Sequence, residues 1–382
     1  MKKINSLLHH KSVMIIAGEA SGDLHGSNLV KAIRRRDNEI FFCGIGGAAL
    51  EREGVDLFFN IRALSVMGIT EVLSKLPAVY RALKEAKRRL KTLHPDLLIL
   101  IDFPEFNLKV AKAAKKFGVP VLYYISPKVW AWRSGRVKKI KTLVNHMAII
   151  LPFEQDFYQN HDIPVTYVGH PLLDTVLADF PPRAKVDTFE PSVIGLLPGS
   201  REKEIIRILP VMIDSAKILS TENGNLKFLI SVAASIDRHL IEKIVNRYKE
   251  SVNFDIVTGG VHEIFKEADF VVAASGTVVL EAAIAGVPMV VLYKMSAVSH
   301  WFAKAMVRLK HFSLVNLIAG KEVVPELLQS EVNPENIAHT VSTMLNDTDG
   351  LNRVKNELYE IKRVLGGAGA SDRVAEIAMR MM

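Results

Sequence analysis

Cysteine is almost absent from this chain, since Cys43 is the single one among 382 residues. A lone cysteine forms no internal disulfide, and no CxxC pair gives it the spacing of a metal site, so we expect a reducing, cytoplasmic setting. No stretch reaches the roughly 18 uncharged apolar residues that a membrane-spanning helix requires. The apolar run at residues 13–17 is too short for the core of a signal peptide. We therefore expect membrane contact, where there is any, to be peripheral.

Low-complexity segments and internal repeats are also absent, and no HExxH or EF-hand pattern occurs. The only Asp-x-Asp, at residues 347–349, is typical of a turn, so we expect no metal and no cofactor. A net charge of +8 favours acidic partners, which means nucleic acid, anionic lipid or phosphorylated substrates. Because no basic tail, zinc-finger spacing or RNP-like motif is present, we expect no nucleic-acid partner.

Short apolar runs alternate with longer amphipathic segments along the chain. In the first half, runs at 12–18 and 97–102 precede helical patterns at 24–36 and 108–117. This alternation predicts βαβ units around a parallel sheet that is buried on both faces. The pattern starts again after residue 190. We therefore predict an α/β fold with two Rossmann-like, doubly wound parallel-sheet domains that face a cleft.

The length of the chain also favours two domains of similar size. The polar, proline-containing stretch DFPPRAKVDTFEP separates the two halves as a connection should. We predict a first domain over 1–178, a linker over 179–191, a second domain over 192–345 and C-terminal helices over 346–382. These helices either cross back onto the first domain or exchange with a second chain in a homodimer.

Two segments of the second half predict helix N-termini that bind anions. In VIGLLPGSREKEI, residues 193–205, an apolar strand leads to Ser200, which can cap the next helix, and to Arg201, a bidentate donor for a phosphate. A capped turn with a solvent-facing arginine, and no ligand, explains the same residues equally well.

The other segment is ADFVVAASGTVVLEAAIAGVP, residues 268–288. Ser275, Gly276 and Thr277 follow a strand and begin a helix at the carboxyl edge of the sheet, where ligands of such sheets bind. Glu281 is a lone carboxylate on an otherwise apolar helix, so it needs a partner, and ribose hydroxyls are suitable. A glutamate that complements the helix dipole is the plainer interpretation.

In the first half, LLILIDFPEFN places Asp102 at the end of a strand that its continuous apolar character marks as central. A carboxylate at that position can act as a general base. An aspartate that caps the turn ahead of Pro104 is equally consistent with the sequence.

Candidate membrane or lipid contacts lie in two further segments. YYISPKVWAWRSGRVKKIKTL sets two tryptophans beside a basic helix, which suits a phosphorylated lipid at a membrane surface or, alternatively, a buried core with a solvated basic face. ALSVMGITEVLSKLP is either a lipid-facing patch or a core helix. The candidates are Val66, Met67, Trp130, Trp132, Arg133 and Arg136.

Eight motifs occur in order along nearly the whole chain: AGEASGDLHG, SVMGITEVL, IDFPEFN, SPKVWAWR, YVGHPL, LLPGSR, ASGTVVLE and LVNLIAGKEVVPELLQ. Together they resemble the lipid-A-disaccharide synthase family. The resemblance implies a GT-B glycosyltransferase of lipid A and lipopolysaccharide biosynthesis in Gram-negative-type bacteria, peripheral to the cytoplasmic face of the inner membrane. It implies that UDP-2,3-diacylglucosamine and 2,3-diacylglucosamine 1-phosphate are joined through a β-1′,6 bond with release of UDP.

The resemblance also implies site residues. It assigns UDP binding to Arg201, Glu281 and Asn316 and a functional carboxylate to Asp102. We predict an inverting displacement in which Asp102 removes the proton of the acceptor 6-hydroxyl while Arg201 and the two helix N-termini hold the departing diphosphate without a metal. His25 is an alternative base.

The loop AGEASGDLHG, residues 17–26, has neither the ending of a P-loop nor the spacing of a dinucleotide turn. With the nucleotide assigned to the second half, we assign this loop to the acceptor sugar. Gly18 and Gly22 would allow a close approach, Glu19 and Asp23 would accept bonds from hydroxyls, and His25 is a further candidate. A plain strand-to-helix turn is the alternative for Asp23, and a UDP-N-acetylglucosamine 2-epimerase is the alternative enzyme.

Overall fold

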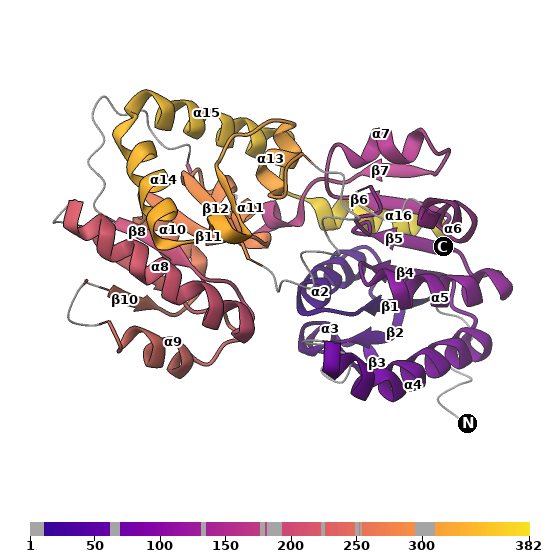
Figure 1. The fold of residues 1–382 in the computed structure, drawn as a ribbon. Helices are drawn as coiled ribbons and strands as arrows, with labels where there is room; N and C mark the ends of the chain where they lie inside the picture. Colours follow the sequence, from indigo (N-terminus) through magenta and orange to yellow (C-terminus); the bar gives the residue numbers. More distant parts are fainter. Residues whose placement is uncertain are drawn as a thin grey trace. The chain divides into compact units, whose positions relative to one another are not determined.

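The computed structural model describes residues 11–61, 69–130, 135–175, 180–181, 193–222, 226–248, 252, 254–294 and 310–382. The chain forms two compact units (Figure 1). Unit 1 comprises Met1–Asp174 and Gly367–Met382, and unit 2 comprises Thr175–Gly366. Each unit holds one parallel sheet with helices on both faces, so the predicted α/β class with two Rossmann-like domains is confirmed.

The sheet of unit 1 has seven strands in the order β3-β2-β1-β4-β5-β6-β7. Every described pairing in it is parallel, because each strand returns through a helical crossover. The strands are β1 Ser12–Ala17, β2 Phe41–Gly46, β3 Asp56–Asn60, β4 Leu97–Ile101, β5 Val121–Tyr124, β6 His146–Ile149 and β7 Val165–Tyr167.

Helices cover both faces of this sheet, which explains why the central strand β4 is apolar throughout. All five residues of β4, LLILI, are buried, as expected for a strand with apolar neighbours on both sides. Successive side chains alternate between the two faces, so Tyr123 and Tyr124 of β5 enter different cores. The helices are α2 Ala20–Arg34, α3 Ala48–Arg52, α4 Ile69–Leu93, α5 Pro104–Lys116, α6 Gly135–Leu143, α7 Glu154–Gln159 and α16 Ala370–Met381, with a 3₁₀ turn at Pro171–Asp174.

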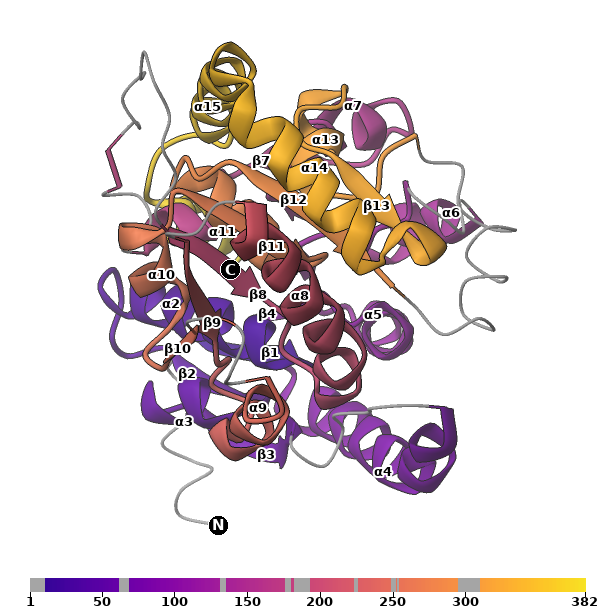
Figure 2. The same cartoon turned by 60° about the vertical axis from the view of Figure 1, so that its left-hand side comes forward.

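The sheet of unit 2 has six strands in the order β10-β9-β8-β11-β12-β13. The strands are β8 Val193–Leu197, β9 Lys227–Ser231, β10 Phe254–Val257, β11 Phe270–Ala274, β12 Met289–Tyr293 and β13 Glu326–Leu328. Helices α8 and α14 pack side by side on one face (Figure 2). The helices are α8 Glu202–Glu222, α9 Arg238–Val245, α10 Val261–Glu267, α11 Thr277–Ile284, α13 Leu314–Ala319, α14 Pro334–Asn346 and α15 Thr348–Val364, with a 3₁₀ turn at Gln329–Glu331.

In both sheets the strand order reverses beside the first strand of the unit. β1 lies next to β4 in unit 1, and β8 lies next to β11 in unit 2. At such a switch point the loops leave the two strands toward opposite faces, which opens a crevice at the carboxyl ends. The loops there carry Glu19 and Asp102 in unit 1, and Ser200 and Ser275 in unit 2. The topology thus gathers most of the predicted site residues at two switch points.

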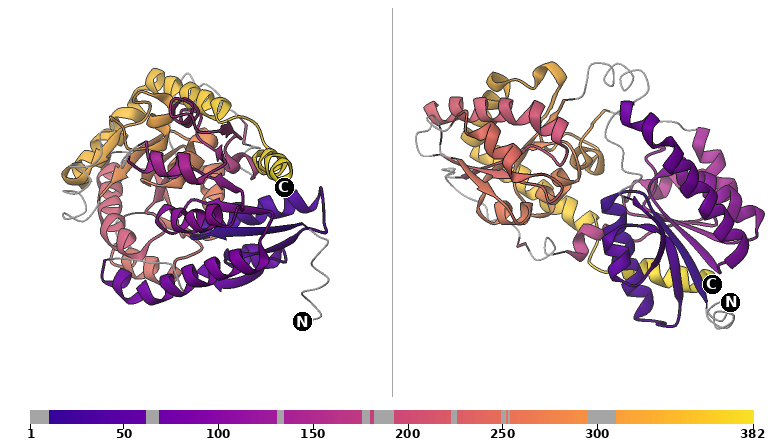
Figure 3. Two further views of the ribbon diagram at one scale, coloured as in Figure 1. Left: turned by 90° about the vertical axis from the view of Figure 1, so that its right-hand side faces the viewer. Right: turned by 90° about the horizontal axis from the view of Figure 1, so that it is seen from below.

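The domain boundaries differ from the predicted ones. The units separate after Asp174, and most of the predicted linker lies outside the described residues. One predicted arrangement returned both C-terminal helices to the first domain, but α15 packs against α11 and α13 within unit 2. Only α16 returns to unit 1, where it packs against α2 (Figure 3). The Asp174 carboxylate fixes it there by accepting hydrogen bonds from the backbone N–H groups of Gly369 at 2.6 Å and Ser371 at 3.1 Å.

Candidate active site

Gly18 follows β1 and lies directly under an aromatic ring. A Cβ atom at Gly18 would come within 2.2 Å of Cγ of Phe103, so the ring already occupies the space that a side chain would need. Close packing against Phe103 thus explains why residue 18 is a glycine, without the predicted approach of a sugar. A Cβ at Gly22 would make ordinary contacts of 3.4 Å with Ile101 and 3.5 Å with Ala17, so packing does not require glycine there.

Asp23 has a structural role in this unit. It is 6% exposed, and its carboxylate accepts hydrogen bonds from the backbone N–H groups of Gly47 at 2.6 Å, Ala49 at 2.9 Å and Leu50 at 3.3 Å. These are orphan donors at the start of α3, so Asp23 caps a neighbouring helix from within α2. Its oxygens are already used, which speaks against the predicted contact with an acceptor sugar.

Asp102 comes directly after β4 in an unusual backbone conformation. Its φ is +44° and that of Phe103 is +46°, which is the left-handed region for two successive non-glycine residues. Such conformations cost about 1–3 kcal/mol each, and they concentrate at functional sites. The Asp102 carbonyl oxygen accepts hydrogen bonds from the Tyr123 hydroxyl at 2.5 Å and from Nδ2 of Asn107 at 2.7 Å.

The surroundings of Asp102 suit a base that works near neutral pH. Burial raises the pKa of its carboxyl to about 6, and the negative charge of Glu19 adds to this effect, while Lys128 opposes it. Glu19 itself is exposed at the N-terminus of α2. The unit 1 switch point therefore brings Glu19 and Asp102 together, as the topology of such sheets requires. Above a pH of about 6 the Asp102 carboxylate is ionised and able to accept a proton.

His25, the alternative base, lies in a different environment. Burial lowers the pKa of its imidazole to about 4, and Asp174 opposes this shift. His25 in turn adds to the lowering of the pKa of His170, which burial brings to about 3. Because a stronger base is the better proton acceptor at neutral pH, these surroundings favour Asp102 over His25.

Unit 2 contains a cavity of about 280 Å³ at its own switch point. The carboxyl ends of β8, β9 and β11 and the first turns of α8 and α11 form its walls. Five predicted donor-site residues line it: Ser200, Ser275, Gly276, Thr277 and Glu281. Helix α8 begins at Glu202, so Arg201 holds the capping position, and Ser200, the predicted cap, lies one residue before it.

Glu281 presents a carboxylate to this cavity from α11. Burial raises the pKa of its carboxyl. Within the part of the chain that the structure describes, the Glu281 carboxylate forms no hydrogen bond or ion pair. The side chain is half-buried, so its carboxylate oxygens stay open to a ligand in the cavity. The carboxylate is therefore available to accept hydrogen bonds from two neighbouring hydroxyls of a ligand, and its contact with ribose stays a prediction.

Glu204 is a cavity residue that the sequence analysis missed. The backbone N–H of Ser200 donates to its carboxylate, and a Cβ at Gly199 would come within 2.4 Å of its Oε2. Burial raises the pKa of Glu204, and the positive charge of Arg201 opposes the shift. Arg201 is exposed beside the cavity. The spacing from Ser200 to Glu204, one turn of helix, was the available signal.

Asn316 is fully buried, and other protein groups use its whole side-chain amide. Nδ2 donates to the carbonyl of Val324 and to Oε1 of Glu326, both at 2.8 Å. Oδ1 accepts from the backbone N–H groups of Val323 at 2.8 Å and Val324 at 3.0 Å. An amide has two donor hydrogens and two acceptor lone pairs, so nothing is left for a nucleotide. This arrangement favours a role in shaping the loop before β13.

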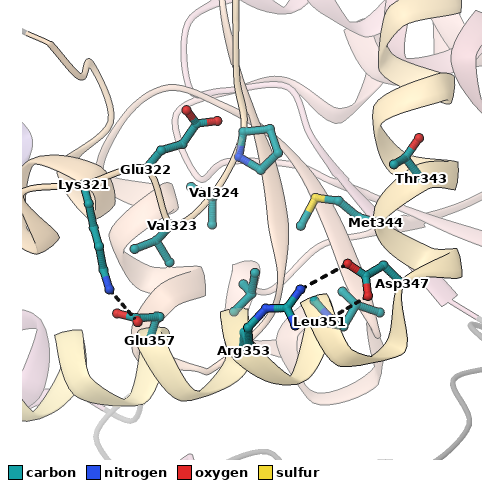
Figure 4. A pocket seen from close by; sticks show the side chains of 13 residues that line it. Lys321, Glu322, Val323, Val324, Thr343, Met344, Asp347, Leu351, Arg353 and Glu357 are labelled. Atoms are coloured by element: carbon teal, nitrogen blue, oxygen red, sulfur yellow. Dashed lines mark hydrogen bonds and ion pairs between the residues drawn. The ribbon is translucent and has the colours of Figure 1, made fainter.

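That loop forms a wall of a second cavity in unit 2, of about 430 Å³ (Figure 4). Val323, Met344 and Leu351 give it an apolar lining. Ion pairs between Lys321 and Glu357 and between Arg353 and Asp347 lie at its edge. Its lining includes none of the predicted site residues, so the cavity at the switch point is the better candidate for the donor.

Trp130 is anchored within unit 1. Its indole N–H donates to Oε1 of Glu154 at 3.0 Å, and its ring meets that of Phe153 edge-on at 4.8 Å. Glu154 is 1% exposed, and burial raises the pKa of its carboxyl to about 7. The buried-tryptophan interpretation thus fits Trp130 better than the predicted lipid contact.

Arg136 forms an ion pair with Glu105. The other candidates for membrane contact, Val66, Met67, Trp132 and Arg133, lie outside the described residues. Among the described helices, none combines the length and the apolar character that crossing a bilayer demands.

Comparison with solved structures agrees with this two-sheet architecture. UDP-GlcNAc 2-epimerase from Neisseria meningitidis, bound to UDP-GlcNAc, aligns with a TM-score of 0.63 at 12% identity, over 97% of this chain and 100% of that chain. The calicheamicin glycosyltransferase CalG4 aligns with a TM-score of 0.62 at 13% identity, over 98% of both chains. The architecture of the two units is the GT-B fold.

The sequence comparisons are more specific. The family model described as lipid-A-disaccharide synthetase matches residues 13–379. The lipid-A-disaccharide synthase of Geobacter metallireducens is 43% identical over 98% of both chains, and that of Myxococcus xanthus is 42% identical over 97% of both. The chain therefore belongs to the lipid-A-disaccharide synthetase family and is a glycosyltransferase.

Proposed function

We propose that this enzyme condenses UDP-2,3-diacylglucosamine with 2,3-diacylglucosamine 1-phosphate to form the β-1′,6-linked disaccharide 1-phosphate and UDP. Membership of the family over nearly the whole chain supports the overall reaction. The observation that carries the donor site is the half-buried Glu281 carboxylate, which has no hydrogen-bond partner among the described residues and faces a cavity at the sheet switch point.

On unit 2, the proposal places the UDP moiety in the cavity between α8 and α11. The Glu281 carboxylate accepts hydrogen bonds from the ribose hydroxyls. The N-termini of α8 and α11 supply backbone N–H donors and a positive dipole to the diphosphate, and Arg201 adds a fixed positive charge. These groups stabilise the charge that develops on the leaving diphosphate, so the proposed mechanism needs no metal.

On unit 1, the proposal gives Asp102 the role of general base. Asp102 removes the proton from the acceptor 6-hydroxyl as that oxygen forms a bond to the anomeric carbon of the donor. The bond between the anomeric carbon and the diphosphate oxygen breaks, and its electron pair leaves with UDP. Configuration inverts, and the proton passes from Asp102 to solvent.

A 2-epimerase activity is not favoured. The solved epimerases share only the fold, at 12–15% identity, whereas the synthases are 35–43% identical over most of the chain. The deciding experiment supplies the purified protein with each acylated sugar alone and then with both, in the presence of a chelator. Mass spectrometry should detect UDP and a disaccharide phosphate only when both sugars are present. UDP release from the donor alone, without disaccharide, would contradict the proposal.

Removal of the Glu281 carboxylate should weaken donor binding. A charged acceptor contributes about 1.5–3 kcal/mol per hydrogen bond, so Glu281→Ala should raise the Kd for UDP roughly 10- to 100-fold. Calorimetric titration with UDP measures the change. Glu360→Ala is a matched control, because Glu360 is exposed on α15 and pairs with Arg363 away from the cavity. Equal affinity in the Glu281 variant and the control would exclude the ribose contact.

The pH dependence of the reaction should follow the charges around Asp102. Glu19 raises the pKa of Asp102 and Lys128 lowers it. Because the base must be ionised, Glu19→Gln should move the acidic limb of kcat/KM to lower pH, and Lys128→Gln should move it to higher pH. A pH–rate profile of each variant gives the midpoints. Shifts in the same direction for both variants would show that Asp102 does not set this limb.

We further propose that the enzyme works at the cytoplasmic face of the inner membrane, where its acylated substrates reside. Exposed Leu76 and Tyr80 on α4, 51% and 69% accessible, support contact with lipid. Co-sedimentation with anionic vesicles tests the membrane contact.

We also propose a homodimer formed by exchange of the C-terminal helix, and light scattering tests it.

A further inference from the structure

The turn at Asp102 and Phe103 needs to be held by other parts of unit 1. L-residues rarely adopt the left-handed conformation, and here two do so in succession, with φ of +44° and +46°. Phe103 is also the residue before Pro104 at the start of α5. A loop of this kind persists only where surrounding contacts determine it.

Two buried side chains supply those contacts. The hydroxyl of Tyr123, on the neighbouring strand β5, donates to the Asp102 carbonyl at 2.5 Å. Nδ2 of Asn107, in the first turn of α5, donates to the same oxygen at 2.7 Å and to the Ile101 carbonyl at 3.2 Å. Both Tyr123 and Asn107 are 0% exposed. The carbonyl of Asp102 is thus held from β5 and from α5 at once.

Apolar packing alone does not account for polar groups at these two positions. Tyr123 belongs to an apolar cluster that includes Leu98, Leu100 and Val110. Oδ1 of Asn107 is buried and has no partner among the described residues, which is unfavourable for folding. Leucine at position 107 would remove this unpaired oxygen, but it would also remove the amide donor of the Ile101 and Asp102 carbonyls. The polar atoms that are retained there converge on one carbonyl, and that carbonyl belongs to the proposed base.

We infer that Asn107 and Tyr123 are positioning residues, which hold the left-handed turn so that the Asp102 carboxylate stays at the β1/β4 switch point beside Glu19 and Lys128. This inference rests on the proposed role of Asp102 as the base. Neither residue touches the substrate in this scheme. Their loss changes where the carboxylate lies and leaves donor binding on unit 2 unchanged.

Tyr123→Phe and Asn107→Leu test the inference, because each removes hydrogen-bond donors from a site that remains filled. A small displacement of a reacting group lowers rates by up to about 100-fold, so we expect kcat to fall roughly 10- to 100-fold with KM for the UDP-sugar unchanged. The acidic limb of the kcat profile should also move, because the carboxylate changes its distance from Glu19 and Lys128. Tyr124→Phe is the matched control: Tyr124 is equally buried, but its side chain enters the core on the opposite face of β5.

Four outcomes separate this inference from its premise. If Asp102→Asn is inactive while both positioning variants keep wild-type kcat and pH profile, the positioning role is wrong and the base assignment stands. A fall in kcat with an equal loss of UDP affinity and of Tm would indicate general destabilisation and would also overturn it. Full activity of Asp102→Asn would remove the premise and the inference together. A selective fall in kcat with a displaced pH limb, absent in Tyr124→Phe, supports it.

Discussion

Asp102→Asn should lower kcat by about 10²- to 10⁴-fold, which is the range that general-base catalysis contributes. The substitution keeps the size of the side chain and removes its basicity. Because burial and Glu19 raise the pKa of Asp102 to about 6, the wild-type rate should rise with pH through this value and level off above it. The variant should lack that acidic limb. Steady-state kinetics from about pH 4 to about pH 8, roughly two units either side of a midpoint near 6, measure both effects.

The binding of the two substrates provides the control for this experiment. The donor site on unit 2 should be unaffected, so the Kd for UDP should match that of the wild type. The same measurement on His25→Ala tests the alternative base, whose imidazole has a pKa of about 4. Near-normal turnover of Asp102→Asn, with loss of the acidic limb in His25→Ala, would reverse the assignment.

Gly18→Ala should destabilise unit 1 and reduce activity together. The new Cβ would lie 2.2 Å from Cγ and 2.7 Å from Cβ of Phe103, which is too close for either atom to stay in place. Overpacking of this kind costs about 1–3 kcal/mol of the free energy of unfolding. Phe103 follows Asp102 in the left-handed turn, so a displaced ring also displaces the proposed base. Urea unfolding and kcat at saturating substrate measure the two effects.

Gly22→Ala is the matched stability control for this prediction. It lies four residues further along, within α2, where a Cβ would meet Ile101 at 3.4 Å in ordinary contact. Alanine also favours a helix over glycine by up to about 1 kcal/mol. The free energy of unfolding of Gly22→Ala should therefore equal or exceed that of the wild type. Comparable destabilisation by both substitutions would mean that the Phe103 contact is not the cause.

The fold could be predicted from the sequence because its signals are local. Apolar runs such as Leu97–Ile101 encode buried parallel strands, and the alternation with helices encodes the crossovers. The switch points follow from that topology, so the positions of Asp102 and Glu281 could be predicted as well. These predictions needed no knowledge of contacts between distant residues.

The roles of several other residues depend on distant partners, and here the sequence was not sufficient. Asp23 caps a helix that begins 25 residues later, and Asp174 binds backbone N–H groups almost 200 residues away. The side-chain oxygen of Asn316 accepts hydrogen bonds from backbone N–H groups of the loop that precedes β13. Asp23 and Asn316 were predicted to contact ligands, and Asp174 was not singled out. All three side chains instead accept hydrogen bonds from backbone N–H groups that only the folded chain brings near them. Polar residue types alone do not distinguish these two uses.

The return of α16 to unit 1 has a consequence for biosynthesis. Val374, Ala375 and Ala378 of this helix belong to the same apolar cluster as Val13 and Ile15 of the first strand. A ribosome makes the N-terminal part first, so unit 1 cannot complete its fold with α16 until all of unit 2 has been translated. During that interval the part of this apolar face that α16 covers stays exposed in the nascent chain, although α2 already packs on the same face. Any chain that terminates early, even at Gly366, would retain this exposed face and be open to chaperone binding or degradation.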